Sequence, residues 1–475
     1  MNNSELGLKI GLECHQQLDG KKLFCNCPCT IKDEKADFEI KRELRVSSSE
    51  TGKTDSAALY EKSKGKHFIY EGYNDVNCLI EIDEQPPEDV NKEAFDIALQ
   101  VALLLKAKPL DAIQFMRKIV IDGSNVSGFQ RTALIATNGE IETTLGKVRI
   151  SSVCLEEESA KKIETTNEYV KYNISRLGIP LIEIATEPDI KTPEHAKETA
   201  EKLGMILRSV KGMRRGLGTI RQDINLSIKN NNRVELKGFQ DLRSIPRVAE
   251  NEIKRQLEIL KTGKDVNSEV RKVEEDFSTT FLRPMPGASR MYPETDIKLI
   301  KITKELLKKI KVPELIAEKV EGLEEKYSIS AELARELVKE EINLEEYTKL
   351  YPKVEASVIA KTLIEVPKEM RARFDVDVDK LNEKHFNQVF DMLNTGKLHK
   401  AFIIDALLEL VRNGQIKQER FKELSDKDIE FVIKGIIESN PGLAFNAIMG
   451  DAMKKLKGKA DPKKIVDIIK KLTSK

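Results

Sequence analysis

The alternation of apolar and polar residues stops near residue 296, and this change constrains the fold more than any other feature of the chain. Before it, several segments alternate with the period of two that is typical of half-buried strands, and residues 8–18 (LKIGLECHQQL) are the clearest example. Helical patterns lie between them, such as residues 91–107 (NKEAFDIALQVALLLKA) and a helix that we expect to begin at Thr192-Pro193. Beyond the loop of residues 283–296 (RPMPGASRMYPETD) the pattern is helical almost throughout, without convincing strands. We therefore expect an α+β fold, with an N-terminal domain built on a mixed sheet and all-α helical and tail domains after it.

The length of 475 residues suggests about three domains. We place them at residues 1–296, 297–352 and 353–475, with the last division at Tyr351-Pro352-Lys353. There is no run of 18 or more apolar residues and no secretory signal pattern. We therefore expect a cytoplasmic protein that makes no membrane contact.

Positive charge has to be local if this chain binds a nucleic acid, because 80 Lys+Arg are balanced by 79 Asp+Glu. The C-terminal segment from Met453 onward is the main candidate, with nine Lys against two Asp. Its first lysines are the expected RNA contacts: Lys454, Lys455, Lys457 and Lys459.

Two carboxylate-bearing strands could hold a divalent cation. Glu13 and His15 are two residues apart on a predicted strand, so both project from one face, and a carboxylate with an imidazole can bind such a cation. In residues 180–188 (PLIEIATEP), Glu183 lies on the face opposite Ile182 and Ile184. In the LEEES segment (residues 155–159) only one or two of the three glutamates can face the same way. The alternatives are an ordinary polar strand surface, or salt bridges with the abundant Lys and Arg.

A third strand, residues 219–228 (TIRQDINLSI), has the most informative polar face. That face carries Arg221, Asp223, Asn225 and Ser227, and a returning strand adds Arg233, Glu235 and Lys237. Cationic and amide side chains beside acids suit a nucleotide phosphate together with its cation. A solvated sheet face is the competing interpretation.

The cysteines suggest a metal site rather than disulfides in a chain of this length. Cys25, Cys27 and Cys29 fall within five residues, and Cys78 is a distant fourth thiol. A zinc ion on four thiolates would be structural, because no coordination position would stay open. Cys14 and Cys154 occur in alternating segments, and we interpret them as small core residues.

As an ordered set, these segments resemble the B/E subunits of tRNA-dependent amidotransferases, and the resemblance covers nearly the whole chain. The matching segments are IGLECHQQLDGKKLFC, VIDGSNVSGFQRTALI, LEEES, RLGIPLIEIATEPDI, RGLGTIRQDINLSI, VELKGFQDL, RPMPGASRMYPETDI and the C-terminal NPGLAFNAIMGDAMKKLKGKADPKKIVDIIKKL. The opening, together with SSSETGKTDSAALYE and FQRTALIATNG, is more similar to the archaeal E-type subunits than to the bacterial B-type subunits.

The resemblance implies an N-terminal "cradle" that binds ATP and Mg²⁺, and helical and tail domains that bind tRNA. It implies an ATP-dependent carbon–nitrogen ligase of protein biosynthesis, which phosphorylates the glutamate of Glu-tRNA(Gln). Ammonia from an asparaginase-like amidase partner would then give Gln-tRNA(Gln), within a heterotetramer. Matched by motif, the Mg²⁺-binding catalytic positions are Glu13, His15, Glu157 and Glu183, and the ATP contacts are Arg221, Lys237, Asn225 and Ser227. Some family members hold zinc in the region of Cys25, Cys27, Cys29 and Cys78.

One departure concerns an extra domain that archaeal E-type subunits usually carry just before the MYPETD loop, resembling an insertion of bacterial aspartyl-tRNA synthetases. Here only about twenty residues separate the helix ending near Leu260 from Leu282, too few for a domain. Two alternatives stay open: a B-type subunit that also acts on Asp-tRNA(Asn), against which the E-like opening argues, and a non-catalytic tRNA-binding scaffold, against which the presence of Glu13, His15, Glu157 and Glu183 argues.

Overall fold

The computed structural model describes residues 6–46, 52, 54–229, 231–287, 291–374, 376–416, 426–439, 444–456 and 462–473. The chain divides into two compact units, residues 1–315 and 316–475. The first unit is built on a large mixed sheet and the second is helical, so the predicted fold class is confirmed. The predicted divisions after residues 296 and 352 remain predictions.

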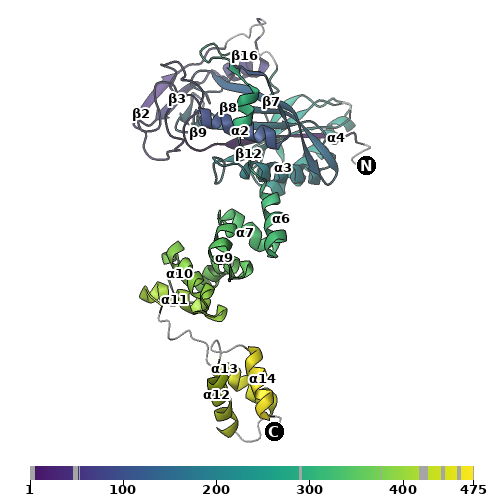
Figure 1. Cartoon of the computed structure of the whole chain (residues 1–475). Helices are drawn as coiled ribbons and strands as arrows, with labels where there is room; N and C mark the ends of the chain where they lie inside the picture. The colour runs from purple at the N-terminus through teal and green to yellow at the C-terminus, as the bar shows by residue number, and fades with distance from the viewer. Residues whose placement is uncertain are drawn as a thin grey trace. The chain divides into compact units, whose positions relative to one another are not determined.

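An 11-stranded sheet organises the first unit (Figure 1). In sheet order its strands are β15 (Thr279–Pro284), β14 (Glu269–Val273), β13 (Val234–Lys237), β12 (Ile220–Ser227), β1 (Lys9–Gln17), β11 (Pro180–Thr186), β8 (Gly146–Glu157), β7 (Phe129–Thr143), β6 (Phe115–Ile119) and β16 (Met291–Pro293), with β4 (Lys108–Pro109) paired to β7. Only β13 and β14 run parallel, and the other pairs are antiparallel. The first strand of the chain therefore lies in the middle of the sheet.

Three helices pack on the apolar face of this sheet: α2 (Lys92–Leu104), α3 (Pro193–Arg208) and α4 (Ile245–Lys261). α3 begins where predicted, with the Thr192 side chain accepting a hydrogen bond from the His195 backbone N–H and Pro193 in the first turn. The apolar residues of β1 point into this core, including Ile10, Leu12 and Cys14, each at most 1% exposed. Because successive strand residues alternate in direction, the charged residues of β1 face the other side of the sheet.

Two smaller sheets complete the first unit. One has the order β2 (Phe38–Arg42), β3 (His67–Gly72), β10 (Tyr169–Asn173) and β9 (Lys161–Thr165). The other pairs β5 (Ala112–Ile113) with β17 (Ile300–Lys301), a strand that lies beyond the loop after which none was expected. Helices α1 (Ser56–Ser63) and α5 (Lys304–Lys309) and the 3-10 turn η1 (Leu242–Ser244) also belong to this unit.

The described residues of the second unit form three apolar clusters. Its helices are α6 (Ile316–Tyr327), α7 (Ala331–Lys339), α8 (Leu344–Leu350), α9 (Ala356–Arg373), α10 (Glu383–Asn394), α11 (Ile403–Asn413), α12 (Asp426–Ser439), α13 (Phe445–Lys455) and α14 (Pro462–Thr473), with 3-10 turns η3 (Val378–Lys380) and η4 (Lys400–Phe402). Helices α12, α13 and α14 share one cluster, built around Ile429, Ile433, Ile448 and Ile469. Within the described part of the chain, no helix is both long and apolar enough to cross a membrane.

Candidate active site

The polar face of the central sheet gathers residues from four neighbouring strands. In the register of these strands, His15 of β1 lies opposite Glu183 of β11 and opposite Arg221 of β12. Glu13 lies opposite Asp223 of β12. Residues directly opposite each other point to the same face, so the predicted faces of these strands are confirmed.

His15 stands at the centre of this group. Its Nε2 atom lies 3.4 Å from Oε2 of Glu183, and its Nδ1 atom lies 4.0 Å from Oδ2 of Asp223. Two sets of side chains could each hold a metal ion, because the possible ligand atoms within each set all lie within 4.8 Å of one another. One set is Glu13, His15 and Asp223, and the other is His15, Glu156 and Glu183. Carboxylate oxygens and an imidazole at such spacing are ligands that divalent cations use.

Two lysines neutralise part of this negative charge. Lys118 of β6 lies 3.1 Å from Oε2 of Glu156 and 3.7 Å from Oε2 of Glu183. Lys237 of β13 lies 2.6 Å from Oδ2 of Asp223 and also pairs with Glu235. The sequence patterns had not singled out Lys118. Its strand reads FMRKI, and only the pairing of β6 with β7 turns this lysine toward the carboxylates.

The charged side chains around His15 change one another's pKa values. Burial lowers the pKa of His15, but the hydrogen bond to Glu183 and the charges of Glu183, Asp223 and Glu156 raise it to about 9. Burial raises the pKa of Glu13, and the negative charges of Glu235 and Glu183 raise it further. Burial also opposes ionisation of Glu183, but the positive charges of Lys118 and His15 hold its pKa below its usual range. Added positive charge would therefore ionise Glu13 more readily.

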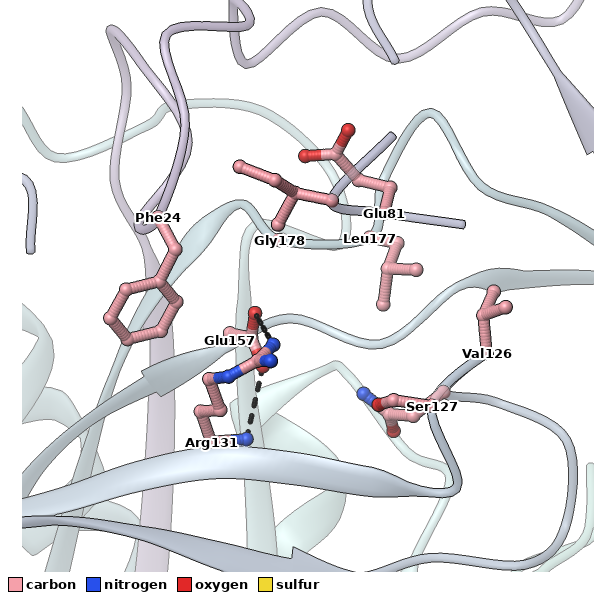
Figure 2. A pocket seen from close by; sticks show the side chains of 10 residues that line it. Phe24, Glu81, Val126, Ser127, Arg131, Glu157, Leu177 and Gly178 are labelled. Atoms are coloured by element: carbon pink, nitrogen blue, oxygen red, sulfur yellow. Dashed lines mark hydrogen bonds and ion pairs between the residues drawn. The ribbon is translucent and has the colours of Figure 1, made fainter. Parts of the chain in front are cut away.

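Glu157 does not lie in this group, although the resemblance assigned it a cation-binding role. It follows Glu156 in β8 and points to the opposite face, where Arg131 donates to it from its backbone N–H at 3.0 Å and from Nη1 at 3.3 Å. Arg131 also pairs with the buried Glu294 at 2.8 Å. Glu157 and Arg131 line one side of a small cavity, and Glu81 and Leu177 lie across it (Figure 2). Glu156 takes the position beside His15 and Glu183.

Three of the four predicted ATP contacts lie beside the carboxylates around His15, and each of the three already bonds a carboxylate. Arg221 holds both carboxylate oxygens of Glu158, at 2.6 and 3.0 Å, and Asn225 donates to Oε1 of Glu13 at 3.0 Å. Lys237 pairs with Asp223 as described above. Ser227 lies at the far end of β12, opposite Lys9, and is not brought to the carboxylates.

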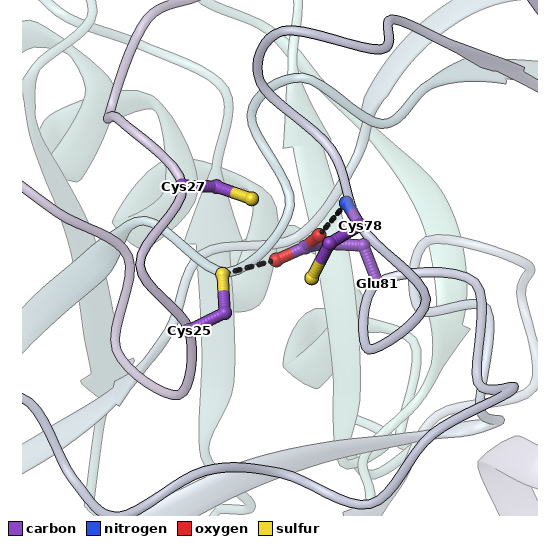
Figure 3. A group of neighbouring side chains, drawn as sticks. All are labelled: Cys25, Cys27, Cys78 and Glu81. Carbon is purple, nitrogen blue, oxygen red and sulfur yellow. Dashed lines mark hydrogen bonds between the residues drawn. The ribbon is translucent and has the colours of Figure 1, made fainter.

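The thiols form a second group, with one correction to the prediction. Cys25, Cys27 and Cys78 come together with the carboxylate of Glu81, and their possible ligand atoms all lie within 4.8 Å (Figure 3). Cys29 is buried but does not belong to this group, because its neighbours are Lys22, Arg214 and Asp19. Spacing alone had no means of finding Glu81, whose only sequence signal is its position three residues after Cys78.

The other two cysteines differ from each other. Cys14 is fully buried in the apolar core, as predicted. Cys154 lies opposite Glu183 in the register of β8 and β11, so it faces the polar side and not the core.

Of the predicted RNA contacts, Lys454 and Lys455 are exposed at the end of α13, and Lys457 and Lys459 lie outside the described residues.

Comparison with known families gives two matches. The model of the "GatB/GatE catalytic domain" matches residues 8–308, and a model named "GatB domain" matches residues 343–472. The first covers the sheet that carries the carboxylate group, and the second covers most of the helical unit.

Curated relatives from archaea match over almost their full length. The chain is 37% identical to the E subunit of the glutamyl-tRNA(Gln) amidotransferase of Methanocaldococcus jannaschii over 624 aligned positions, which cover 99% of each chain. It is 36% identical to the protein of the same name from Methanococcus maripaludis, with 98% of each chain covered. For Archaeoglobus fulgidus the identity is 34%, with 99% of this chain and 98% of the relative covered. The alignment of 624 positions exceeds the 475 residues of this chain, so the relative contains a large segment that is missing here.

Proposed function

The chain belongs to the GatB/GatE family of tRNA-dependent amidotransferase subunits, and from that premise we propose that it converts Glu-tRNA(Gln) to Gln-tRNA(Gln). ATP would phosphorylate the γ-carboxylate of the glutamate esterified to tRNA. Ammonia from an asparaginase-like partner amidase would then displace the phosphate and form the amide, within a heterotetramer. The names of the archaeal relatives support the glutamate-specific form of this reaction.

One observation carries this proposal: the convergence of Glu13, His15, Glu156, Glu183 and Asp223 on the polar face of the central sheet. These residues would hold Mg²⁺, which when bound neutralises the phosphate oxygens of ATP. His15 belongs to both sets of possible ligands, so it would help to position the carboxylates of both sets. Its ring must lose a proton before it can act as a ligand.

The chain's own cations have a separate role in this chemistry. The substrate carboxylate is already a nucleophile, so the protein has to position it and to neutralise charge on the transferred phosphoryl group. Lys118 projects between Glu156 and Glu183, where it can contact an anionic substrate group. Arg221 is held in place by two hydrogen bonds to Glu158, so its guanidinium is oriented before substrate arrives.

The test is transamidation by the purified full-length chain with Glu-tRNA(Gln), ATP, Mg²⁺ and ammonium chloride, scored as Gln-tRNA formed. We expect product without any amidase, no product without ATP, and loss of product in Glu183→Ala. Glu198→Gln, which removes the charge of an acid that bonds Thr144 away from the group, is the matched control. A parallel reaction with Asp-tRNA(Asn) tests the B-type alternative. Absence of product with every tRNA, even after adding a partner amidase, would leave only the scaffold function.

A further inference from the structure

We propose that a basic surface at the end of α3 and in the loop after it binds the single-stranded 3′ end of tRNA beside the carboxylate group. We define this basic surface by five exposed side chains: Met205, Arg208, Lys211, Arg215 and Leu217. The inference rests on the proposed function, because it concerns the RNA substrate of that reaction. It places an RNA contact in the first unit, in addition to the lysines at the end of α13.

The sequence around the basic surface carries positive charge without acids. Residues 203–222 contain no Asp or Glu, although five of them are Lys or Arg. The preceding turns of α3 differ, since Lys197 lies 3.7 Å from Glu201 and Lys202 lies 3.1 Å from Glu198. In a chain of balanced net charge, such a local excess of cations is what a nucleic-acid site requires.

The cations of the basic surface are unpaired in the part of the chain that the structure describes. Arg208, Lys211 and Arg215 are exposed, and none of them forms an ion pair or a side-chain hydrogen bond with a described residue. One acid, Asp19, is bound to the loop because its backbone N–H donates to the carbonyl of Gly212 at 2.8 Å. Its carboxylate forms no ion pair with a described lysine or arginine. The three cations can therefore bind phosphates without first breaking an ion pair.

Two apolar side chains lie among these cations. Leu217 is fully exposed, and it is held between Gly216 and Gly218, whose φ angles of +119° and +78° suit glycine better than other residues. Met205, in the last turns of α3, is 40% exposed. Apolar side chains can pack against nucleobases, but the bases of a duplex are already stacked and paired. The combination of cations and apolar side chains therefore favours single-stranded RNA, in which the bases are accessible.

The position of the loop connects the basic surface to the carboxylate group. The backbone N–H of Arg214 donates to the carbonyl of Gln17 at 2.9 Å, so the loop is bound to the end of β1. The chain then continues into β12, where Arg221 lies opposite His15 of β1. The amino acid is esterified to the 3′ end of tRNA, so RNA bound on the basic surface would bring that end close to the carboxylates.

The experiment measures binding of a fluorescent RNA hairpin to the full-length chain by anisotropy at several salt concentrations. The hairpin reproduces the acceptor and T arms of tRNA(Gln), including the unpaired 3′ nucleotides. We expect the triple variant Arg208→Gln, Lys211→Gln and Arg215→Gln to bind it about 10–100-fold more weakly at about 0.1 M salt. The slope of log affinity against log salt should fall by about two to three, because three phosphate contacts are lost.

A second variant tests the apolar contact separately. Leu217→Ser should weaken binding by about fivefold or more and leave the salt slope unchanged, because it removes a contact with a base and no charge. A hairpin without the unpaired 3′ nucleotides should bind wild type and Leu217→Ser equally. Equal sensitivity of both hairpins to Leu217→Ser would overturn the assignment to the 3′ end.

The matched control removes three charges that already pair with acids. The triple variant Lys147→Gln, Lys197→Gln and Lys202→Gln should bind the hairpin within about twofold of wild type. Unchanged binding in the first triple variant, or equal loss in both, would overturn the proposal. This readout needs neither ATP nor ammonia, so it is independent of whether the chain forms Gln-tRNA.

Association with the partner amidase distinguishes an RNA site from a protein interface. We expect the first triple variant to co-purify with the amidase as the wild type does. Normal binding of the hairpin together with loss of the amidase would show that the basic surface contacts the partner protein, and would overturn the proposal.

Discussion

The carboxylates of Glu156 and Glu157 lie on opposite faces of the central sheet, although the two residues are adjacent in β8. Glu156 pairs with Lys118 at 3.1 Å beside His15 and Glu183, whereas Glu157 accepts hydrogen bonds from Arg131. Nearly identical substitutions at these two positions therefore test different parts of the molecule.

Glu156→Gln should raise the Mg²⁺ concentration that gives half-maximal transamidation by about tenfold or more, because it removes a charged oxygen from the proposed cation site. Glu157→Gln should leave that concentration unchanged, since its carboxylate lies across the sheet. Magnesium titrations of the initial rate at saturating ATP and Glu-tRNA(Gln) distinguish the two. Equal shifts for both variants would contradict this assignment.

Lys118→Met should reduce kcat by roughly 100-fold, the effect typical of removing one group that stabilises transition-state charge. The substitution keeps an unbranched side chain of nearly the same length and removes the ammonium group. Filter binding of Glu-tRNA(Gln) should change little, because the proposed role is in the reaction and not in RNA affinity. A normal kcat with weakened tRNA binding would assign Lys118 to substrate binding instead.

Arg131→Met should destabilise the first unit by about 3–5 kcal/mol, because it leaves Glu157 buried without its cation, whereas Glu294 keeps its ion pair with Arg117. Urea unfolding followed by circular dichroism measures the change. Adding Glu157→Gln to this variant should recover part of the loss, because it removes the buried carboxylate that Arg131 paired with. Arg149→Met is the matched control, since Arg149 pairs with Asp189 at the surface, 65% exposed, and should cost below about 1 kcal/mol. A loss of less than 1 kcal/mol in Arg131→Met would contradict the prediction.

The stabilising effect of His15 should decrease as the pH rises. Its pKa is raised in the folded chain from 6.5 to about 9, so the charged ring stabilises the fold fully below pH 6.5, and this contribution is lost as the pH rises through 9. His15→Gln should therefore destabilise the metal-free protein more at about pH 6 than at about pH 10, by roughly 2–3 kcal/mol. Urea unfolding in the presence of a chelator measures this difference.

His195 provides the control with the opposite sign. Burial lowers its pKa below 6.5, so its contribution is present above that pH and is lost as the pH falls. The destabilisation caused by His195→Gln should therefore not shrink between about pH 6 and pH 10. A His15→Gln penalty that is constant with pH would contradict the raised pKa.

Replacing Lys454 and Lys455 together by Glu should weaken tRNA binding and reduce its dependence on salt. Each phosphate that is no longer neutralised lowers the slope of log affinity against log salt by about one. Fluorescence anisotropy at several salt concentrations measures both quantities. Lys434→Glu is the control, because Lys434 already pairs with Glu430 in α12. Unchanged affinity in the double variant would place the RNA contacts elsewhere.

The sequence was informative where neighbouring residues alone determine to which face of the sheet a side chain points. Glu13, His15, Glu183 and Asp223 were assigned to polar strand faces by alternation, and the paired strands bring those faces together. The alternating pattern extends over only a few successive residues, so it can be recognised without knowledge of the fold. The start of α3 at Thr192-Pro193 is local in the same way.

What depends on pairing between distant strands was not predictable. Three successive glutamates at 156–158 offer no local reason to choose one, and only the register of β8 against β11 and β7 selects Glu156. Lys118 was missed because Arg117 beside it is equally polar, and the pairing of β6 decides which of them faces the carboxylates. Glu81 was missed because no local feature distinguishes it from the other acids that follow Cys78, such as Asp83 and Glu84.

The central position of β1 has a consequence for the synthesis of the protein. β1 leaves the ribosome well before its neighbours β11 and β12, which begin only at Pro180 and Ile220. At translation rates of about 5–20 residues per second, β1 waits on the order of ten seconds before its first partner exists. During that time the apolar residues of β1 have neither of their neighbouring strands in the central sheet. The carboxylate group can assemble only when the last of these strands has been made, so a chain that ends before Ile220 lacks Asp223 and the strand that carries it.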